Sequence, residues 1–382
     1  MLLYIAIASL LIWLYLVAVH GGFWRIPRFI LPPASVPDHA PFVAAVVPAR
    51  DEADVIAESM SSLLNQRGVR MHIFLVDDSS QDGTADVALR TAESAAKSAE
   101  LTVIQGSPLP PGWSGKLWAV QQGIGRASSL NPDFLLLTDA DIVHSPENIQ
   151  TLASLSENGQ YDLVSLMVKL HCRTVAERAL IPAFVFFFLM LYPPSWIADP
   201  NRRTAGAAGG CMLVRPKALH KAGGIAAIRG KIIDDCALAR KVKNSGGRVW
   251  LGLTTETQSI RAYGSFAAIG NMISRAAFSQ LRHSGLLLVT MLLGLAITFV
   301  APPLLVFSGR PAPGLIGAAS WMLMAFCFFP TVRYYRLNPV WALLLPVIAL
   351  FYMAATLHSA FKFWSGRGGE WKGRVQDPVQ RQ

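Results

Sequence analysis

The sequence contains few charged residues and few cysteines for its length, and both shortages limit what the chain can be. Only 15% of its 382 residues are charged, whereas 52% are hydrophobic, and the mean hydropathy is +0.39. A soluble enzyme of this length normally carries more charge, so we expect membrane-spanning segments beside one catalytic domain. The four cysteines form no Cys-x-x-Cys pair and have no His at zinc-site spacing. They therefore indicate reduced thiols rather than a disulfide framework or a structural zinc site.

Acidic residues are also scarce, which leaves the chain basic. There are 24 Asp and Glu residues against 34 Lys and Arg residues, so the net charge is +10. Such an excess can bind nucleic acid or an anionic membrane surface. The basic residues are scattered and lack interleaved aromatic side chains, so the sequence argues against a nucleic-acid partner. We therefore expect the membrane to be the anionic partner.

Long apolar runs predict where the chain meets the membrane. Residues 1–24 are predicted to form an N-terminal transmembrane anchor, because no charge interrupts Met1–Val19 and no signal-peptide cleavage site is evident. Arg25 and Arg28 follow this run, and the positive-inside rule places them, with the catalytic domain, on the cytoplasmic side of a bacterial-type inner membrane. Residues 285–363 are predicted to form C-terminal transmembrane helices. Their three apolar stretches are Gly285–Ser308, Leu315–Val332 and Val340–Phe363.

Two parts of this topology remain open. One N-terminal span and three C-terminal spans would put both chain ends outside, yet the basic tail 364–382 favours the cytoplasm. One apolar stretch would then not cross fully. A fifth apolar run, 179–197, is interrupted by Pro182 and by Pro193-Pro194, and we expect a helix that lies in the membrane interface. A buried core helix is the alternative.

The segment between the anchors changes to alternating strands and helices. After a linker at 25–41, short apolar runs alternate with helical patterns, which predicts an α/β fold with a mostly parallel sheet covered by helices on both faces. Ligands bind such sheets at the carboxyl ends of the strands. The predicted strands are Phe42–Val47, His72–Val76, Leu101–Gln105 and Phe134–Thr138, and the predicted helices are Glu52–Asn65, Gly83–Ala99 and Lys116–Ser128.

Two carboxylates follow the last of these strands. Asp139 and Asp141 are separated by one residue, and alternate residues of an extended segment project to the same side. Two such carboxylates suit a hard divalent cation, Mg2+ or Mn2+, that also holds phosphate oxygens. A solvated turn is the alternative, because a bare Asp-x-Asp occurs by chance in many proteins.

Acids also follow the second predicted strand. Asp77-Asp78 leads into a polar turn, in which Asp82 is expected to cap the next helix while Asp78 is left to accept a hydrogen bond from a nucleotide base. Lys116 follows a Pro- and Gly-rich loop and opens a helix, a position that suits a diphosphate, with a surface lysine as the alternative.

A third acidic pair precedes a predicted helix at Cys236–Asn244. Asp234 and Asp235 are either ordinary helix N-terminal acids or include a general base for an acceptor hydroxyl. We expect the helix dipole to keep the basic carboxylate ionised.

These motifs occur together in one order, and the set resembles family 2 glycosyltransferases with a GT-A fold over about residues 42–282. With Gly-Trp-Ser-Gly-Lys-Leu-Trp-Ala at 112–119 and the membrane anchors, the chain looks like the hopanoid-associated branch, and ceramide glucosyltransferases are similar in layout. The motifs are Pro48-x-x-Asp51-Glu52, Asp77-Asp78-Ser-Ser-x-Asp-Gly-Thr, Asp139-x-Asp141, Gly209-Gly210 and Asp234-Asp235-x-x-Leu238-Ala239.

The resemblance implies an inverting, metal-dependent transferase that moves a sugar from a nucleotide-sugar, expected to be a UDP-sugar, to a membrane lipid. A hopanoid or a polyprenyl phosphate would qualify as the acceptor. The implied roles are Asp51, Glu52 and Asp78 around the uridine, Lys116 and Arg275 at the diphosphate, Asp139 on the nucleotide and the metal, Asp141 on the metal, and Asp235 as the base supported by Asp234.

The chain departs from the family pattern at two places. Asp234 stands where the family has Glu, which is a mild change. Met272 and Ala276 stand where processive members keep Gln and Trp, so the resemblance implies one sugar per acceptor. A catalytically degenerate nucleotide-binding membrane protein is the rival class, and the intact Asp141 and Asp235 argue against it.

Overall fold

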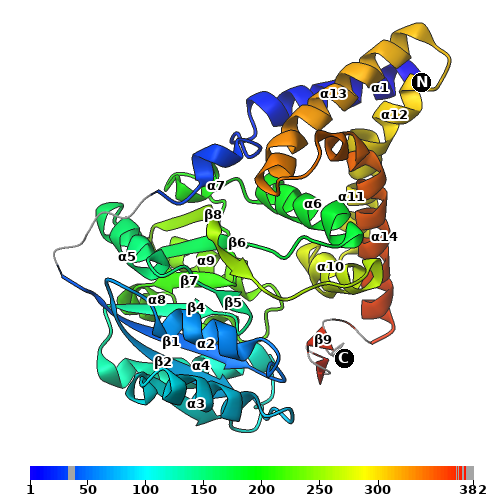
Figure 1. Cartoon of the computed structure of the whole chain (residues 1–382). Helices are drawn as coiled ribbons and strands as arrows, with labels where there is room; N and C mark the ends of the chain where they lie inside the picture. Colours follow the sequence, from blue (N-terminus) through cyan, green and yellow to red (C-terminus); the bar gives the residue numbers. More distant parts are fainter. Residues whose placement is uncertain (33–38, 367, 369, 372–373, 376–382) are drawn as a thin grey trace.

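The computed structural model describes residues 1–32 and 39–366, together with 368, 370–371 and 374–375. An α/β unit occupies one side of the molecule, and apolar helices pack against it on the other side (Figure 1). Arg367, Lys372 and Arg381 of the predicted basic tail lie outside the described residues.

The α/β unit is built on an eight-stranded mixed sheet. Its strands are β1 (Phe42–Ala49), β2 (Arg70–Asp77), β3 (Leu101–Gln105), β4 (Phe134–Thr138), β5 (Ile142–Val143), β6 (Leu163–Lys169), β7 (Cys211–Val214) and β8 (Val249–Ser259). The spatial order is β3-β2-β1-β4-β7-β6-β8-β5. Strands β1 to β4 pair in parallel, whereas β7 runs antiparallel to both β4 and β6. Because β6 and β8 pair in parallel, β8 points the same way as β4, and their carboxyl ends share one edge. A separate hairpin joins β9 (Glu370–Trp371) to β10 (Arg374–Val375).

The four predicted strands are confirmed, and β3 and β4 cover the predicted residues. Their apolar runs are buried because helices cover both faces of the sheet. Along β1, the side chains of Val43, Ala45 and Val47 enter one core, and those of Ala44 and Val46 enter the other. The pleat of the strand therefore divides one apolar run between two cores.

Helices of the α/β unit fill those two cores. Residues of α2, α3 and α5 belong to the first core, and residues of α4, α8 and α9 belong to the second. The helices are α2 (Ile56–Leu64), α3 (Thr84–Ser94), α4 (Gly115–Ala127), α5 (Asn148–Asn158), α8 (Pro216–Lys221) and α9 (Asp234–Asn244), and short 3-10 turns are η1 (Ile26–Phe29), η2 (Ser98–Glu100), η3 (Ser128–Leu130) and η4 (Ile225–Ile228).

The apolar part contains the predicted membrane helices. Among the described residues, four helical segments are long and apolar enough to cross a membrane: Val175–Ala198, Gly285–Val306, Pro311–Tyr334 and Pro339–Trp364. The last three coincide with the predicted C-terminal stretches, whereas α1 has 17 residues and is shorter. The elements are α1 (Leu2–Ala18), α6 (Val175–Leu191), α7 (Pro194–Ala198), α10 (Phe266–Gln280), α11 (Gly285–Leu295), the π-helical η5 (Ala296–Val300), α12 (Ala301–Val306), α13 (Pro311–Tyr334), η6 (Pro339–Leu344) and α14 (Leu345–Trp364).

The N-terminal helix α1 packs against α13 and against the π-helical turn η5. Trp13 is fully buried there, and its indole N–H donates to the carbonyl of Thr298 at 2.8 Å. Its ring meets Phe299 edge-on at 5.5 Å. A polar side chain on α1 is thus satisfied by backbone from the C-terminal part of the chain.

Helix α6 lies between the sheet and the other apolar helices. In the segment Val175–Ala198, which includes α6, 61% of the most apolar 18-residue window is buried within the structure. Phe186 contacts the ring of Phe328 at 5.2 Å, and the Tyr352 hydroxyl donates to the Leu180 carbonyl at 2.7 Å. This burial favours the alternative of a core helix over a helix that rests in the membrane interface.

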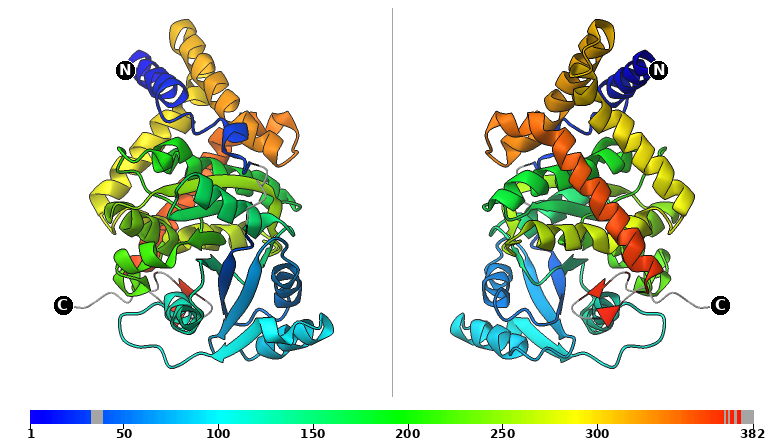
Figure 2. Two further views of the ribbon diagram at one scale, coloured as in Figure 1. Left: turned by 90° about the vertical axis from the view of Figure 1, so that its left-hand side faces the viewer. Right: turned by 90° about the vertical axis from the view of Figure 1, so that its right-hand side faces the viewer.

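Helix α14 is fastened along α10, the last helix of the predicted catalytic segment. Ser359 Oγ accepts a hydrogen bond from the Phe278 amide at 3.0 Å, and Lys362 Nζ donates to Asn271 Oδ1 at 2.9 Å. In Figure 2, α14 runs along the α/β unit, while α1 and α13 project away from it. This packing favours α14 as the stretch that does not cross fully, and the topology itself stays a prediction.

Candidate active site

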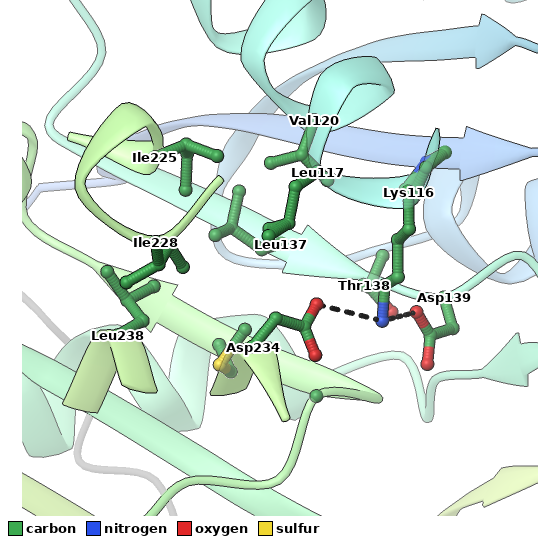
Figure 3. A pocket seen from close by; sticks show the side chains of 13 residues that line it. Lys116, Leu117, Val120, Leu137, Thr138, Asp139, Ile225, Ile228, Asp234 and Leu238 are labelled. Atoms are coloured by element: carbon green, nitrogen blue, oxygen red, sulfur yellow. Dashed lines mark ion pairs between the residues drawn. The ribbon is translucent and has the colours of Figure 1, made fainter. Parts of the chain in front are cut away.

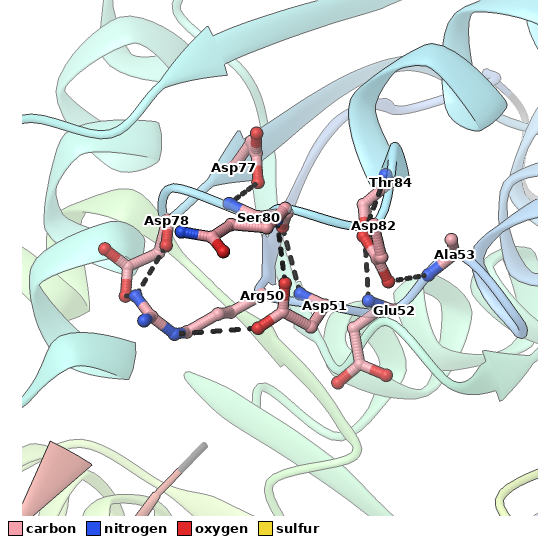
Figure 4. Close-up of polar contacts among 10 residues, drawn as sticks. Arg50, Asp51, Glu52, Ala53, Asp77, Asp78, Ser80, Asp82 and Thr84 are labelled. Atoms are coloured by element: carbon pink, nitrogen blue, oxygen red, sulfur yellow. Dashed lines mark hydrogen bonds and ion pairs between the residues drawn. The ribbon is translucent and has the colours of Figure 1, made fainter. Parts of the chain in front are cut away.

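The loops after β1 and β2 meet at the carboxyl edge of the sheet, because these strands pair in parallel with Ala49 beside Asp77. Figure 4 shows the polar contacts that join them. Arg50 Nη1 donates to the Asp78 carbonyl at 2.8 Å and lies 3.4 Å from the Asp78 carboxylate. Asp78 is buried and bound to Arg50, so a nucleotide base would share this carboxylate with a guanidinium, and the role of Asp78 at the base stays a prediction.

Asp51 and Asp82 complete the connection between the two loops. Asp51 adopts a φ of 50°, and its carboxylate accepts from the Gln81 amide at 2.9 Å. Asp82 accepts from the amides of Ala53 at 2.9 Å and Thr84 at 3.0 Å. The N-cap of α3 is Gly83, so the prediction of Asp82 as the cap is wrong by one position, and Asp82 binds the first amide of the helix instead. Burial raises the pKa of Asp82, but hydrogen bonds from Thr84 and Ala53 outweigh it, and the pKa is lowered. Hydrogen bonds to the carboxylates of Asp51 and Asp82 therefore hold the loops after β1 and β2 together.

Lys116 lies at the centre of the site, in the first turn of α4. Its ammonium is 2.7 Å from an oxygen of Asp139 and 3.6 Å from an oxygen of Asp234, as the dashed lines in Figure 3 show. Burial lowers the pKa of Lys116, but these carboxylates and Asp235 raise it more, so the lysine stays charged. A cavity of about 20 Å³ lies beside it, with Leu117 and other apolar side chains in its wall.

Asp235 is held beside this cluster by two backbone amides. Its Oδ2 accepts from Gly209 at 2.9 Å and its Oδ1 from Cys236 at 2.6 Å. Burial, and next the charge of Asp234, raise the pKa of Asp235 to about 6, although Lys116 and the two amides oppose them. The helix dipole therefore does not hold the pKa of this carboxylate at its ordinary value, because burial outweighs it, but with a pKa of about 6 Asp235 is still mostly ionised at neutral pH.

Asp141 belongs to a second cluster, centred on Arg261. Ser259 Oγ donates to Asp141 Oδ2 at 2.7 Å, and Arg261 Nε lies 3.4 Å from the same oxygen. The other end of the guanidinium donates to Glu52. Burial lowers the pKa of Arg261, but Asp141 and Glu52 raise it more. The sequence interpretation missed Arg261, and only its place just after the strand β8 could have indicated it.

Asp139 and Asp141 fit the predicted divalent cation by their chemistry. Mg2+ is commonly held by one or two carboxylates together with substrate phosphates, and both residues follow β4 at the binding edge. Among the described residues, no group of three or more His, Cys, Asp or Glu side chains could hold a metal ion alone. Each carboxylate is instead paired with a cationic side chain, Lys116 or Arg261, so a metal would have to rearrange these ion pairs.

A buried histidine supports the strand that carries these aspartates. Thr138 Oγ1 donates to the Gly210 carbonyl at 2.7 Å, and His144 Nε2 lies 3.0 Å from the same hydroxyl. Asn148 Nδ2 lies 3.0 Å from His144 Nδ1. Burial lowers the pKa of His144 to about 3, so the ring is neutral and donates through Nε2. The residue locks the end of β4 to the Gly209-Gly210 segment, and the sequence interpretation did not find it.

Arg275 lies on α10 and is exposed. In the part of the chain that the structure describes, it forms no ion pair. Its charge affects Tyr263: burial and then Asp141 raise the pKa of Tyr263, whereas Arg261 and Arg275 lower it. Its assignment to the diphosphate stays a prediction.

Comparison with known proteins identifies the domain. Residues 44–223 match the family described as Glycosyl transferase family 2. A curated relative, the undecaprenyl-phosphate 4-deoxy-4-formamido-L-arabinose transferase of Pseudomonas syringae pv. syringae (strain B728a), is 29% identical over 126 residues, which are 32% of this chain and 34% of that protein. The chain thus matches about a third of the length of this relative.

A solved structure shares the fold over nearly the whole chain. A mannosyltransferase from Pyrobaculum calidifontis, solved with GDP-Man and Mn2+, is similar with a TM-score of 0.56 and 18% identity, and the match covers 95% of this chain and 99% of that one. The narrower resemblance to the hopanoid-associated branch stays a prediction. The predicted fold and the enzyme class, glycosyltransferase, are supported: residues 44–223 match the family 2 glycosyltransferase model, and the chain has a GT-A fold joined to apolar helices.

Proposed function

We propose that this protein is an inverting glycosyltransferase that moves one sugar from a nucleotide-sugar, a UDP-sugar, to a hydroxyl group of a membrane lipid. The observation that carries the proposal is Asp235, a carboxylate with a pKa of about 6 beside the Lys116 ion-pair cluster. A general base works best when its pKa lies near the operating pH. An ordinary surface aspartate, with its lower pKa, would be a weaker base.

The donor side of the site is rich in groups for a diphosphate. Asp139 and Asp141 would hold the divalent cation, which when bound neutralises charge on the leaving nucleoside diphosphate. Lys116 places its ammonium 2.7 Å from Asp139. Asp51, Glu52 and Asp78 would surround the nucleoside from the β1 and β2 loops, and Arg275 would approach the diphosphate. The Mn2+ in the Pyrobaculum neighbour fits this use of a divalent cation.

The acceptor has two candidates that differ in chemistry. The curated relative is named for undecaprenyl phosphate, which favours a polyprenyl phosphate. A phosphate monoester has a second pKa of about 6 and is already ionised at neutral pH, so it needs no base. A hydroxyl lipid such as a hopanoid does need one. The raised pKa of Asp235 therefore favours the hydroxyl acceptor.

Replacing Asp235 by Asn separates these candidates. The amide keeps the shape of the side chain but cannot take a proton. With a hydroxyl lipid, we expect kcat to fall by at least about a hundredfold, because general base catalysis contributes about 10²–10⁴-fold. The affinity for UDP, measured by titration calorimetry, should change little. Full activity of Asp235→Asn, or a wild-type enzyme that glycosylates polyprenyl phosphate and no hydroxyl lipid, would overturn the hydroxyl proposal.

The same assays address the two other expectations. Mass spectrometry of the product should show one added sugar, because Met272 and Ala276 replace the residues that processive members keep. A ladder of longer glycans would contradict this. A purified chain that binds UDP but neither transfers nor hydrolyses any UDP-sugar would instead be the degenerate nucleotide-binding protein.

A further inference from the structure

A groove of about 640 Å³ lies between η1, which follows the N-terminal helix, and the last turns of α13. No residue of the candidate active site lines it. Its apolar wall is formed by Trp24, Ile26, Pro27, Ile30, Phe329 and Pro330. The volume is within the range of small-molecule sites, and the wall is of the kind that takes hydrocarbon.

The polar lining of this groove has one sign of charge. Arg25, Arg28 and Arg333 line it, and no Asp or Glu does. Within the described ranges, none of the three arginines forms an ion pair. The three arginines come from two segments that are distant in sequence, and they line the same groove as the apolar wall. Guanidinium groups bind phosphate oxygens in a bidentate manner, so the lining complements an anionic phosphate ester.

The aromatic residues of the groove hold its shape. The Trp24 indole N–H donates to the Val17 carbonyl at 3.1 Å, and its ring lies 4.9 Å from that of Phe326. The Arg25 guanidinium lies 5.0 Å from the Trp24 ring. On the other side, the Tyr334 hydroxyl donates to the Thr254 carbonyl of β8. Specific contacts therefore fix the walls of the groove, and they connect the end of α1 and α13 with the sheet.

The position of the groove matches the headgroup layer of a bilayer. Helix α1 ends at Ala18 and α13 ends at Tyr334, and the groove lies where both helices reach the α/β unit (Figure 1). Trp and Tyr side chains concentrate at this level of membrane proteins, and basic residues there attract anionic lipids. The positive-inside rule also places all three arginines on the same side of the membrane, which is necessary because they line one groove.

We propose that this groove binds an anionic phospholipid of the leaflet next to the catalytic domain. Its phosphate would pair with Arg25, Arg28 and Arg333, and its acyl chains would follow Phe329 and Pro330. The occupant is a phospholipid rather than the sugar acceptor, because an acceptor must present its reacting group to Asp235, and the groove shares no residue with the cavity beside Lys116. The bound lipid would hold the N-terminal anchor against α13 and β8.

Native mass spectrometry of the full-length protein in a neutral detergent tests this proposal. Delipidated wild type is mixed with phosphatidylglycerol and phosphatidylcholine at equal concentration, and we expect it to retain one phosphatidylglycerol. The triple variant Arg25→Gln, Arg28→Gln, Arg333→Gln should bind it on the order of a hundredfold more weakly, since each basic residue near an anionic surface contributes about fivefold. The control triple Arg90→Gln, Arg126→Gln, Arg240→Gln loses the same charge from exposed positions elsewhere and should bind normally.

Three results would overturn the proposal. They are equal retention by the two triple variants, no preference for phosphatidylglycerol over phosphatidylcholine, and displacement of the lipid by equimolar polyprenyl phosphate, which would assign the groove to an acceptor. The single variant Arg333→Gln guards against misfolding, because this residue is exposed and lies in the last turn of α13. It should fold as wild type by circular dichroism and weaken phosphatidylglycerol binding about fivefold.

Discussion

Two ion-pair clusters share the carboxyl edge of the sheet, and they divide the Asp-x-Asp motif between them. In the lysine cluster, one ammonium faces Asp139 and Asp234, with Asp235 close enough to be affected. In the arginine cluster, one guanidinium bridges Glu52 and Asp141. The lysine cluster has the larger excess of negative charge, and it is there that a carboxylate becomes a weaker acid.

The difference shows how one edge can hold both a base and a metal ligand. A guanidinium is a planar fork that can pair with two carboxylates at once, and carboxylates are the side chains that commonly hold Mg2+. An ammonium is a compact charge that cannot neutralise three carboxylates at once. The excess, together with burial, leaves Asp235 with a pKa of about 6. Four predictions test this division.

The largest effect is expected from Asp141→Ala. Removing the predicted metal ligand should lower the transfer rate on the order of a thousandfold, because electrostatic stabilisation of the leaving diphosphate is lost. Initial rates with Mg2+ or Mn2+ measure this, with chelator-treated wild type as the reference. If Asp141 serves only to pair with Arg261, the variant and the chelated enzyme will both remain active, and the metal assignment fails.

A matched pair of variants separates the clusters by pH dependence. Lys116 is among the groups that lower the pKa of Asp235, whereas Arg261 is not. In Lys116→Met the pKa of Asp235 should rise, so the acidic limb of the kcat/KM profile should move to higher pH. Arg261→Gln should lower activity but leave that limb in place. An equal displacement in both variants would mean that the two clusters act as one.

The wild-type profile should itself report Asp235. The base must be deprotonated, so kcat/KM should decline as the pH falls below about 6. Folding stability should depend on pH in the opposite direction to activity, because the folded state binds the proton of Asp235 more tightly than the unfolded chain does. The stabilisation from protonated Asp235 should be present at about pH 4 and lost as the pH rises through 6. Thermal unfolding of wild type and Asp235→Asn across this window measures it, and identical pH dependence would contradict the assignment.

The smallest effect is expected from Asp234→Asn. Asp234 raises the pKa of Asp235 by its charge, so its removal should move the acidic limb to lower pH, opposite to Lys116→Met. Turnover at neutral pH should fall only severalfold, in keeping with a supporting role. A loss greater than that of Asp235→Asn would exchange the two roles.

Local sequence pattern was sufficient for the first half of the sheet and for most of the acids. The predicted bounds of β3 and β4 agree with the structure to the residue. A short apolar run between polar turns indicates a strand from local sequence alone, whichever segments it later pairs with. The predicted placement of Asp51, Asp78 and Asp139 at strand ends follows from the same rule, since parallel strands finish at one edge.

The contacts that the sequence did not predict are those between distant segments. Ser259 reaches Asp141 across 118 positions, and Arg261 reaches Glu52 across 209. They depend on the register of β5 with β8, which no periodicity within either segment specifies. The sequence interpretation did not predict the raised pKa of Asp235 for the same reason. A helix N-terminus can be recognised in the sequence, whereas burial of the side chain by distant segments cannot.

The hydrogen bond between Trp13 and Thr298 has a consequence for biosynthesis. The donor and the acceptor are 285 positions apart, so the ribosome releases α1 long before its partner exists. At about 5–20 residues per second, the interval is on the order of 15–60 s. During that time the indole N–H must bind water, lipid or an insertion factor. The N-terminal helix therefore reaches its final place only after the catalytic domain has been made, and the membrane part is the last to assemble.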